Sequence, residues 1–507
     1  MTKSFSNMDV YGFGKKENRY KIALRGLKGI NMLDKRKFYI NGAWVEPVEA
    51  HDLKVIDPST EGACAVISNG TSKDVDRAVA AAKAAFDGWK HTAPQKRLTF
   101  VEKILDIYNQ RRGEMAKAIS TEMGAPIDMA LEQQVGGGAY FIEGFIDSFK
   151  HFSFKTELVK GRKDSALQYE PVGVVGLITP WNWPMNLINL KVIPALLTGC
   201  TMVLKPSEIA PLSGLLYADI IDQAGLPKGV FNLVNGDGAG VGTCLSGHPD
   251  IAMISFTGST GVGKAISKNA SDTLKHVDLE LGGKGANLVF ADAREDAIKW
   301  SVLACFNNSG QSCNAPTRMF VERSIYEKAK KIAKDVANNV KLAVASEHGN
   351  HLGPVVSKAQ FDKIQGLIQS GIDEGATLVA GGTGLADGFK RGYFVRPTVF
   401  ADVKPDMRIF RQEIFGPVLS MIPFDSEEEA IAMANDTDYG LTNYVQSGDK
   451  EKCHRVATAL RSGMVEVNGK SLPKESFFGG VKYSGHAREG SIWGIKQFLD
   501  TKAISEW

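Results

Sequence analysis

The sequence has little cysteine, little net charge and no long hydrophobic run. Its 507 residues include six scattered cysteines and no C-x-x-C pair, so neither a zinc site nor a redox motif is expected and no metal is predicted. Few, scattered cysteines are typical of free thiols in a reducing compartment such as the cytoplasm. A formal net charge of +3 gives no reason to expect a nucleic-acid partner. The longest apolar runs, such as residues 172–178, are too short to span a bilayer, so no membrane partner is expected.

Residues 1–32 differ in composition from the rest of the chain. They include many basic residues, among them Lys15, Lys16 and Arg19, and few acidic ones. The segment lacks the continuous apolar stretch of a secretion signal. We interpret it as a flexible basic extension or the product of an upstream start codon, with a targeting peptide as the alternative.

Short β-branched runs alternate with helical patterns through most of the chain. Strands are expected at 172–178, 202–204, 230–234, 253–256 and 286–290, with helices at 214–224 and 261–271 between them. This alternation predicts βαβ units and a mainly parallel sheet. A second alternating region, from about 317 to 445, predicts a second α/β domain. Charged helical patterns, including 75–89 and 97–122, dominate residues 72–150.

The segment TPWNWP at 179–184 directly follows an expected buried strand. Its prolines and tryptophans favour a rigid, non-helical turn. Such a turn presents Asn182 at the carboxyl end of the strand, where open α/β sheets bind ligands. The Asn182 amide could donate a hydrogen bond to an oxyanion. A purely structural turn capped by the asparagine is the alternative.

Two further clusters also follow expected strands. In KPSE at 205–208, Lys205 and Glu208 could hold ribose hydroxyls, although for this cluster alone ordinary surface charge is the favoured explanation. The segment FTGSTGVGK at 256–264 opens a helix, and its glycines would let backbone N–H groups approach a pyrophosphate. It nearly matches the P-loop of a nucleotide triphosphatase, but Ala265 replaces the Ser or Thr that binds Mg²⁺. It is not a Rossmann G-x-G-x-x-G motif either.

The fourth cluster joins ELGGK at 280–284 with GQSC at 310–313. Glu280 precedes two glycines that permit close backbone approach. Cys313 lies between polar residues, where a thiolate could be exposed and activated. By contrast, Cys200 and Cys305 lie beside apolar runs and are expected to be buried, unreactive thiols.

The order and character of these clusters resemble the aldehyde dehydrogenase superfamily, and the resemblance covers the chain from about residue 38 to residue 504. Further motifs occur in the same order as in that family, before and after the four clusters: NGAW at 41–44, DP at 57–58, EIFGP at 413–417, Asn435, YGL at 439–441 and FGGVKYSG at 478–485.

The resemblance implies oxidation of an aldehyde to a carboxylic acid. Cys313 would attack the aldehyde, Asn182 would stabilise the oxyanion, and Glu280 would activate water to hydrolyse the thioester. Lys205 completes the implied catalytic set. Because coenzyme-A-acylating relatives lack the glutamate, Glu280 predicts a free acid product; acyl transfer to coenzyme A is the alternative. An inactive family member would be expected to lose Cys313, Asn182 or Glu280, and all three are present.

The resemblance also implies NAD as the cofactor, with NADP as the alternative. Glu208 favours NAD, because a carboxylate would repel a 2′-phosphate. The implied cofactor contacts are Thr179, Pro180, Trp181, Lys205, Ser207, Glu208, Gly238, Phe256, Thr257, Gly258, Ser259, Leu281, Gly282, Glu413 and Phe415.

The implied fold is α/β, with three parts. A Rossmann-type coenzyme-binding domain would comprise residues 33–149 and 172–282, and an α/β catalytic domain residues 283–481. A small oligomerisation β-hairpin would comprise residues 150–171 and 482–507. Because an unpaired strand edge is a liability, a homodimer or homotetramer is expected.

The substrate side departs from the usual family pattern. The residue before the FGG motif is Phe477 rather than the common proline. An apolar tunnel suited to an aliphatic or aromatic aldehyde is expected from Trp183, Leu187, Leu190, Phe477 and Phe478. Lys470 or Lys474 could attract the carboxylate of a semialdehyde, or could simply be solvated lysines of a loop.

Overall fold

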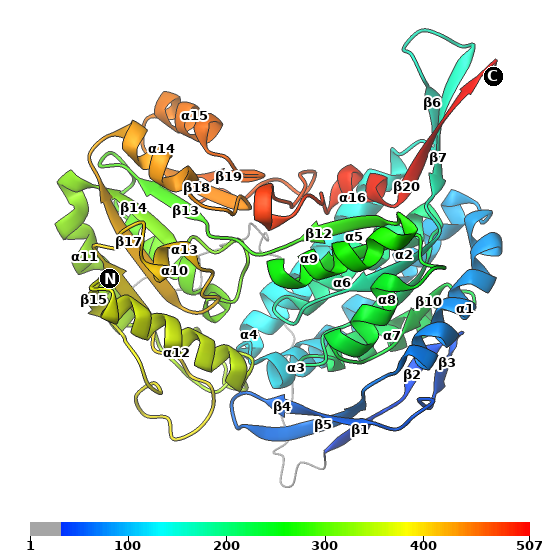
Figure 1. Cartoon of the computed structure of the whole chain (residues 1–507), viewed down its shortest axis with the longest axis horizontal. Helices are drawn as coiled ribbons and strands as arrows, with labels where there is room; N and C mark the ends of the chain where they lie inside the picture. The colour runs from blue at the N-terminus through cyan, green and yellow to red at the C-terminus, as the bar shows by residue number, and fades with distance from the viewer. Residues whose placement is uncertain (1–31, 507) are drawn as a thin grey trace.

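The computed structural model describes residues 32–506, which form two α/β units and a projecting arm (Figure 1). The predicted basic extension lies outside the described residues except for Met32. Within residues 32–506, every helix is too short or too polar to cross a bilayer.

The first unit is built on a seven-stranded sheet in which five neighbouring strands are parallel. In spatial order its strands are β12 (His276–Glu280), β11 (Met253–Thr257), β8 (Val174–Ile178), β9 (Thr201–Lys205), β10 (Phe231–Leu233), β2 (Phe38–Ile40) and β3 (Ala43–Val45). Strands β2 and β3 extend the sheet in antiparallel pairings. Strands β8 to β11 are buried throughout, which explains why they appear in the sequence as continuous apolar runs.

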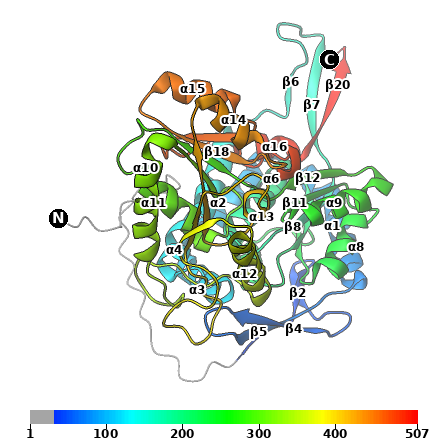
Figure 2. The same ribbon diagram turned by 60° about the vertical axis from the view of Figure 1, so that its left-hand side comes forward.

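Helices cover both faces of this sheet (Figure 2). The helices of this unit are α1 (Ser72–Lys90), α2 (Pro94–Gln110), α3 (Arg112–Met123), α4 (Ile127–Met129), α5 (Gly136–Lys150), α6 (Pro184–Thr198), α7 (Leu212–Ala224), α8 (Thr243–Gly247) and α9 (Thr260–Ala270). The helical segment expected at 97–122 is two helices, because the backbone of Arg111 leaves the helical region between α2 and α3. A separate three-stranded sheet contains β1 (Leu33–Lys35), β5 (Gly62–Ser68) and β4 (Asp52–Asp57).

The second unit is also built on a seven-stranded sheet. Its order is β15 (Thr377–Ala380), β16 (Thr398–Ala401), β17 (Val418–Phe424), β14 (Arg318–Glu322), β13 (Ala286–Val289), β18 (Thr442–Gln446) and β19 (Met464–Val467). Only β15 is antiparallel to its neighbour among these strands. Its helices, with the C-terminal one, are α10 (Ala297–Phe306), α11 (Arg323–Asn338), α12 (Lys358–Asp373), α13 (Arg408–Arg411), α14 (Glu427–Asn435), α15 (Lys450–Ala459) and α16 (Ser491–Gln497). The sheet is wider than the region expected at 317–445, because β13 and β19 also belong to it.

The arm is a three-stranded antiparallel sheet that projects from the body of the molecule (Figure 1). It contains β6 (Lys155–Glu157), β7 (Ser165–Pro171) and β20 (Leu499–Ser505), so two segments far apart in the chain pair here. The residues of β6 are all exposed.

The register of the first sheet brings the sequence clusters together. Ile178 at the end of β8 lies opposite both Lys205 on β9 and Phe256 on β11, and Thr257 lies opposite Glu280 on β12. The segments that follow these strands therefore meet at one edge of the sheet, as expected for ligand sites of open parallel sheets.

Candidate active site

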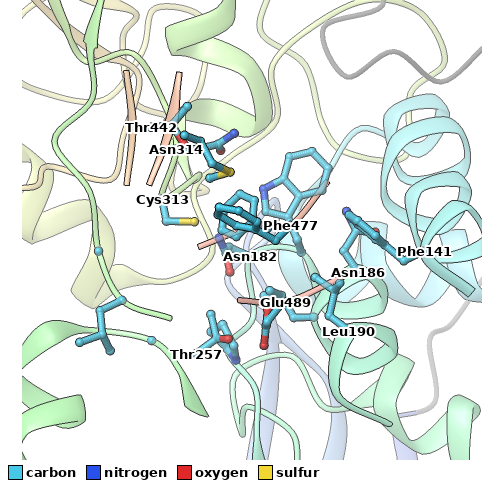
Figure 3. Close-up of a pocket in the computed structure, with 18 of the residues that line it drawn as sticks. Phe141, Asn182, Asn186, Leu190, Thr257, Cys313, Asn314, Thr442, Phe477 and Glu489 are labelled. Carbon is cyan, nitrogen blue, oxygen red and sulfur yellow. The ribbon is translucent and has the colours of Figure 1, made fainter. Parts of the chain in front are cut away.

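A cavity of about 360 Å³ lies at this edge, lined by residues of both α/β units. One wall, which we call the strand-end wall, follows β8, β11 and β12 and comprises Pro180, Trp181, Asn182, Thr257, Gly258, Ser259, Leu281 and Gly282. The other, the apolar wall, comprises Tyr140, Phe141, Trp183, Leu187, Leu190, Met464, Leu472, Phe477 and Phe478. Cys313 and Asn314 also line the cavity, and Figure 3 shows Cys313 near Asn182 and Phe477.

A strained turn positions Cys313. Asn308, Ser309 and Gly310 have positive φ angles of 53°, 55° and 72°, a conformation that non-glycine residues rarely adopt. Hydrogen bonds hold the turn: the Asn308 amide donates to the main-chain oxygen of Asn182 at 2.9 Å, and the Ser309 hydroxyl donates to the Gly353 carbonyl at 2.8 Å. The turn that precedes the cysteine is thereby fixed against the β8–α6 segment.

Asn182 is held by the same network. Its side-chain Nδ2 donates to the Gln311 carbonyl at 3.1 Å, and Gln134 Nε2 donates to the Asn182 main-chain oxygen at 3.0 Å. In the next residue, Trp183 Nε1 donates to the Ser312 hydroxyl at 2.8 Å. These bonds join the asparagine loop to the cysteine loop, so a bound group could contact both residues.

The two glycines after Glu280 allow close approach, as the sequence predicted. A Cβ on Gly283 would lie 2.1 Å from the Cys313 carbonyl oxygen, and one on Gly282 would lie 2.6 Å from Glu413 Oε2. Any larger side chain at either position would displace the cysteine loop or Glu413. The Gly283 N–H also donates to Glu413 Oε1 at 2.8 Å.

The environment of the Cys313 thiol differs from the sequence expectation. Burial raises its pKa, the charges of Glu413 and Glu280 raise it further, and the N–H groups of Cys313 and Asn314 only partly oppose this. Cys313 is only partly exposed, and this environment favours the protonated thiol until a ligand or a base changes it. A nearby base or positive charge is required to generate the nucleophile.

Glu280, at the end of β12, is buried beside the cavity and is not one of the residues that line it. Neither carboxylate oxygen has a hydrogen-bond partner among residues 32–506. Burial raises the pKa of Glu280 well above its usual value, and the charge of Glu489 raises it further. An unrestrained, proton-accepting carboxyl group next to the cysteine is suited to general base catalysis.

Two residues next to Glu280 were not predicted from the sequence. Lys191 of α6 forms a buried ion pair with Glu489, and its Nζ also donates to the Ser255 hydroxyl at 3.1 Å. Glu489 lines the cavity (Figure 3). The available signal was Lys191 itself, a single charge in an otherwise apolar helix, because a buried charge requires a partner.

The predicted ribose contacts lie together beside the cavity. Lys205 is buried at the end of β9, and its Nζ donates to Glu208 at 3.2 Å and to the Pro206 carbonyl at 3.1 Å. Ser207 lies in the loop after β9, and Gly238 begins a π-helical turn (Gly238–Gly242) after β10. Of the predicted contacts, Thr179, Lys205, Ser207, Glu208, Gly238 and Phe256 do not line the cavity that contains Cys313.

The geometry of the glycine-rich segment argues against a P-loop. Ser259 caps helix α9 by accepting the Val262 N–H at 3.4 Å, and Ser259 lines the cavity. Lys264 Nζ instead lies 3.7 Å from the centre of the Tyr483 ring. The lysine is therefore engaged outside the loop, whereas a P-loop lysine points at the phosphates.

Glu413 and Phe415, which are predicted cofactor contacts, line the cavity from the second unit. Phe415 has a positive φ of 62° and contacts Trp181 edge-to-face, with ring centres 5.5 Å apart. This contact places two aromatic rings in the lining of the cavity that Cys313 also lines.

All five predicted tunnel residues line the cavity in the apolar wall. Phe477 packs edge-to-face against Trp493, with ring centres 5.5 Å apart. Of the two loop lysines, Lys474 lines the cavity and is ion-paired with Asp147 of α5, whereas Lys470 is exposed.

Comparisons with known proteins agree with the sequence resemblance. The sequence model described as "Aldehyde dehydrogenase family" matches residues 44–504. A relative from Pseudomonas sp., named 3-succinoylsemialdehyde-pyridine dehydrogenase, is 46% identical over 475 residues, covering 93% of this chain and 99% of the relative.

Solved structures agree as well. Aldehyde dehydrogenase from Bartonella henselae has a TM-score of 0.94 and 67% identity, covering 94% of this chain and 100% of the other. A mutant of aldehyde dehydrogenase C from Pseudomonas syringae, solved with NAD+ and octanal, has a TM-score of 0.91 and 45% identity, covering 93% and 96%. The α/β fold predicted from the sequence is confirmed, and the chain belongs to the aldehyde dehydrogenase family.

Proposed function

We propose that this protein oxidises an aldehyde to a carboxylic acid, with NAD+ as the hydride acceptor and water as the second substrate. The observation that supports this most strongly is the joining of the Asn182 and Cys313 loops at one cavity by direct hydrogen bonds. A nucleophile and an oxyanion donor thereby share one space.

The residues at the carboxyl edge of the first sheet fit a dinucleotide. The buried hydroxyls of Thr179 and Thr257 have no partner among residues 32–506 and are available to a polar ligand. Glu208 is partly exposed next to Lys205, so its carboxylate can accept bonds from ribose hydroxyls. The Pseudomonas syringae and Bacillus cereus aldehyde dehydrogenases were solved with NAD+. When bound, NAD+ supplies the hydride acceptor and a positive ring that favours the thiolate.

Cys313 attacks the aldehyde carbon, and the aldehyde oxygen becomes an oxyanion. The Asn182 Nδ2 and the Cys313 main-chain N–H donate to this oxygen. Each such donor is worth about 2.7–4 kcal/mol of barrier. After hydride leaves the carbon, the acyl group remains on Cys313 as a thioester.

Glu280 then activates water to hydrolyse the thioester. Because no hydrogen bond from residues 32–506 holds its carboxyl group, its side chain can turn from its buried position into the cavity. Its raised pKa suits a group that must accept a proton from water near neutral pH. The product is a free carboxylic acid, and coenzyme A is not required.

The wider predictions fit the same function. We infer that residues 33–149 and 172–282 bind the coenzyme and that residues 283–481 supply the nucleophile. Residues 150–171 and 482–507, which include the arm, would mediate assembly into a homodimer or homotetramer. The cysteines are free thiols, which suits a cytoplasmic enzyme.

The test is a panel of aliphatic and aromatic aldehydes with NAD+, followed by NADH absorbance in the wild type and in Cys313→Ala. The wild type is expected to oxidise several aldehydes without coenzyme A, and the variant none. Undiminished activity in the variant, or a requirement for coenzyme A, would contradict the proposal. The same assay with NADP+ is expected to give a lower kcat/KM, since Glu208 repels a 2′-phosphate.

A further inference from the structure

One carboxylate in the cavity is not used by the proposed reaction. Glu466 lies on β19, lines the cavity, and has no hydrogen bond or ion pair among residues 32–506. Of the four other charged lining residues, Glu413 accepts the Gly283 N–H, Glu489 and Lys474 form ion pairs, and Lys363 interacts electrostatically with Glu413. Glu466 is thus a charge without compensation in a largely apolar surface.

The position of Glu466 is close to the nucleophile. Its register partner on the neighbouring strand is Tyr444, and Tyr444 Oη donates to the main-chain oxygen of Asn314 at 2.6 Å. Asn314 follows Cys313 and, with Glu466, lines both the main cavity and a small adjoining one. An aldehyde bound to Cys313 would therefore have its chain within reach of this carboxylate.

A carboxylate here is unfavourable without a ligand. Burial alone raises the pKa of Glu466 to about 7, because among residues 32–506 no positive group offsets the loss of water. The adjoining small cavity is lined by Trp300 and Tyr444, whose ring centres are 6.2 Å apart. A carboxylate beside aromatic rings is a combination that binds organic cations.

We propose that Glu466 recognises a positively charged group on the substrate, so that the preferred aldehydes carry an amine or quaternary ammonium. This inference rests on the proposed function and specifies the substrate class of the same site. Attraction to a cation would also disfavour aldehydes that carry a carboxylate, in contrast to the lysine hypothesis from the sequence.

The test uses pairs of aldehydes that differ in charge but not in shape. They are 3-aminopropanal with butanal, and 4-(trimethylammonio)butanal with 5,5-dimethylhexanal, so that two chain lengths are sampled. In the wild type, kcat/KM for the cation of at least one pair is expected to exceed that of its neutral partner by about tenfold or more. Glu466→Gln should remove that preference while neutral aldehydes are still oxidised. The matched control is Glu475→Gln, at an exposed position of the 469–476 loop. This variant should keep the preference for the cation.

A wild-type preference for the neutral member of both pairs would overturn the inference. An unchanged preference in Glu466→Gln, or an equal loss in Glu475→Gln, would overturn it too. These outcomes are distinct from failure of the proposed function, in which neither neutral aldehyde would be oxidised in a Cys313-dependent manner.

Discussion

The strand-end wall and the apolar wall of the cavity are held in different ways. On the strand-end side, Asn182 is fixed by side-chain hydrogen bonds to the cysteine loop, and Glu413 is fixed by the Gly283 N–H. On the apolar side, Phe477 is placed mainly by ring packing against Trp493. Hydrogen-bonded groups have a narrow geometry, whereas packed rings tolerate changes of shape. Changes in the first wall should therefore lower the rate for every aldehyde, and changes in the second should alter which aldehyde is preferred.

The largest effect is expected for Asn182→Ala. Removal of the amide eliminates an oxyanion donor, so kcat should fall by about 100- to 1000-fold for all aldehydes. Asn186→Ala is the matched control, since Asn186 also lines the cavity but on helix α6. Steady-state kinetics with short and long aldehydes would show the difference. An equal loss in both variants, or a loss that depends on chain length, would remove the distinction between the walls.

A smaller and selective effect is expected for Phe477→Ala. The loss of apolar contact should lower kcat/KM for octanal by about tenfold and leave acetaldehyde nearly unchanged. Phe389→Ala, which removes a ring stacked on Phe394 outside the cavity, should change neither value. A similar loss for both aldehydes in Phe477→Ala would mean that the apolar wall also positions the reacting groups.

The smallest effect is a shift in pH dependence. Glu280 acts as a base only when deprotonated, and its pKa is raised by burial and by Glu489. Thioester hydrolysis should therefore speed up as pH rises through the pKa of Glu280. Glu489→Gln removes a negative neighbour and leaves Lys191 without its partner, so both changes lower the pKa of Glu280. The rising part of the plot of hydrolysis rate against pH (its rising limb) should move about one pH unit toward acid, as measured by single-turnover hydrolysis.

Glu475→Gln serves as the control for this shift, because Glu475 is exposed on the loop before Phe477. A limb that stays in place in Glu489→Gln, or moves toward alkaline pH, would contradict the electrostatic coupling.

The chemistry of the first wall could be predicted because it lies in short motifs after strands. Asn182, Thr257 and Glu280 each occur at or directly after the end of a parallel strand, and parallel neighbours bring such ends together. The separation of α2 from α3 and the full width of the second sheet could not be predicted from the sequence. Helix ends depend on backbone angles, and the width of a sheet depends on pairing with distant strands.

The second wall and the electrostatics could be predicted only in part. The apolar character of Leu187 and Phe477 was evident, but the ion pair of Lys191 with Glu489 joins residues 298 positions apart and is set by tertiary packing. Likewise, the raised pKa of Cys313 depends on enclosure by both units rather than on its polar neighbours in sequence. Local sequence cannot report such burial.

The most direct test of the central claim is to trap the thioester on Cys313. Glu280→Gln should form the acyl-enzyme with NAD+ and octanal but hydrolyse it slowly. Intact-protein mass spectrometry should then show one added octanoyl group, and peptide mapping should locate it on Cys313. The octanoyl group should be absent from the double variant that carries both Glu280→Gln and Cys313→Ala. No added mass in Glu280→Gln, or an octanoyl group on another residue such as Cys305, would contradict the proposed mechanism.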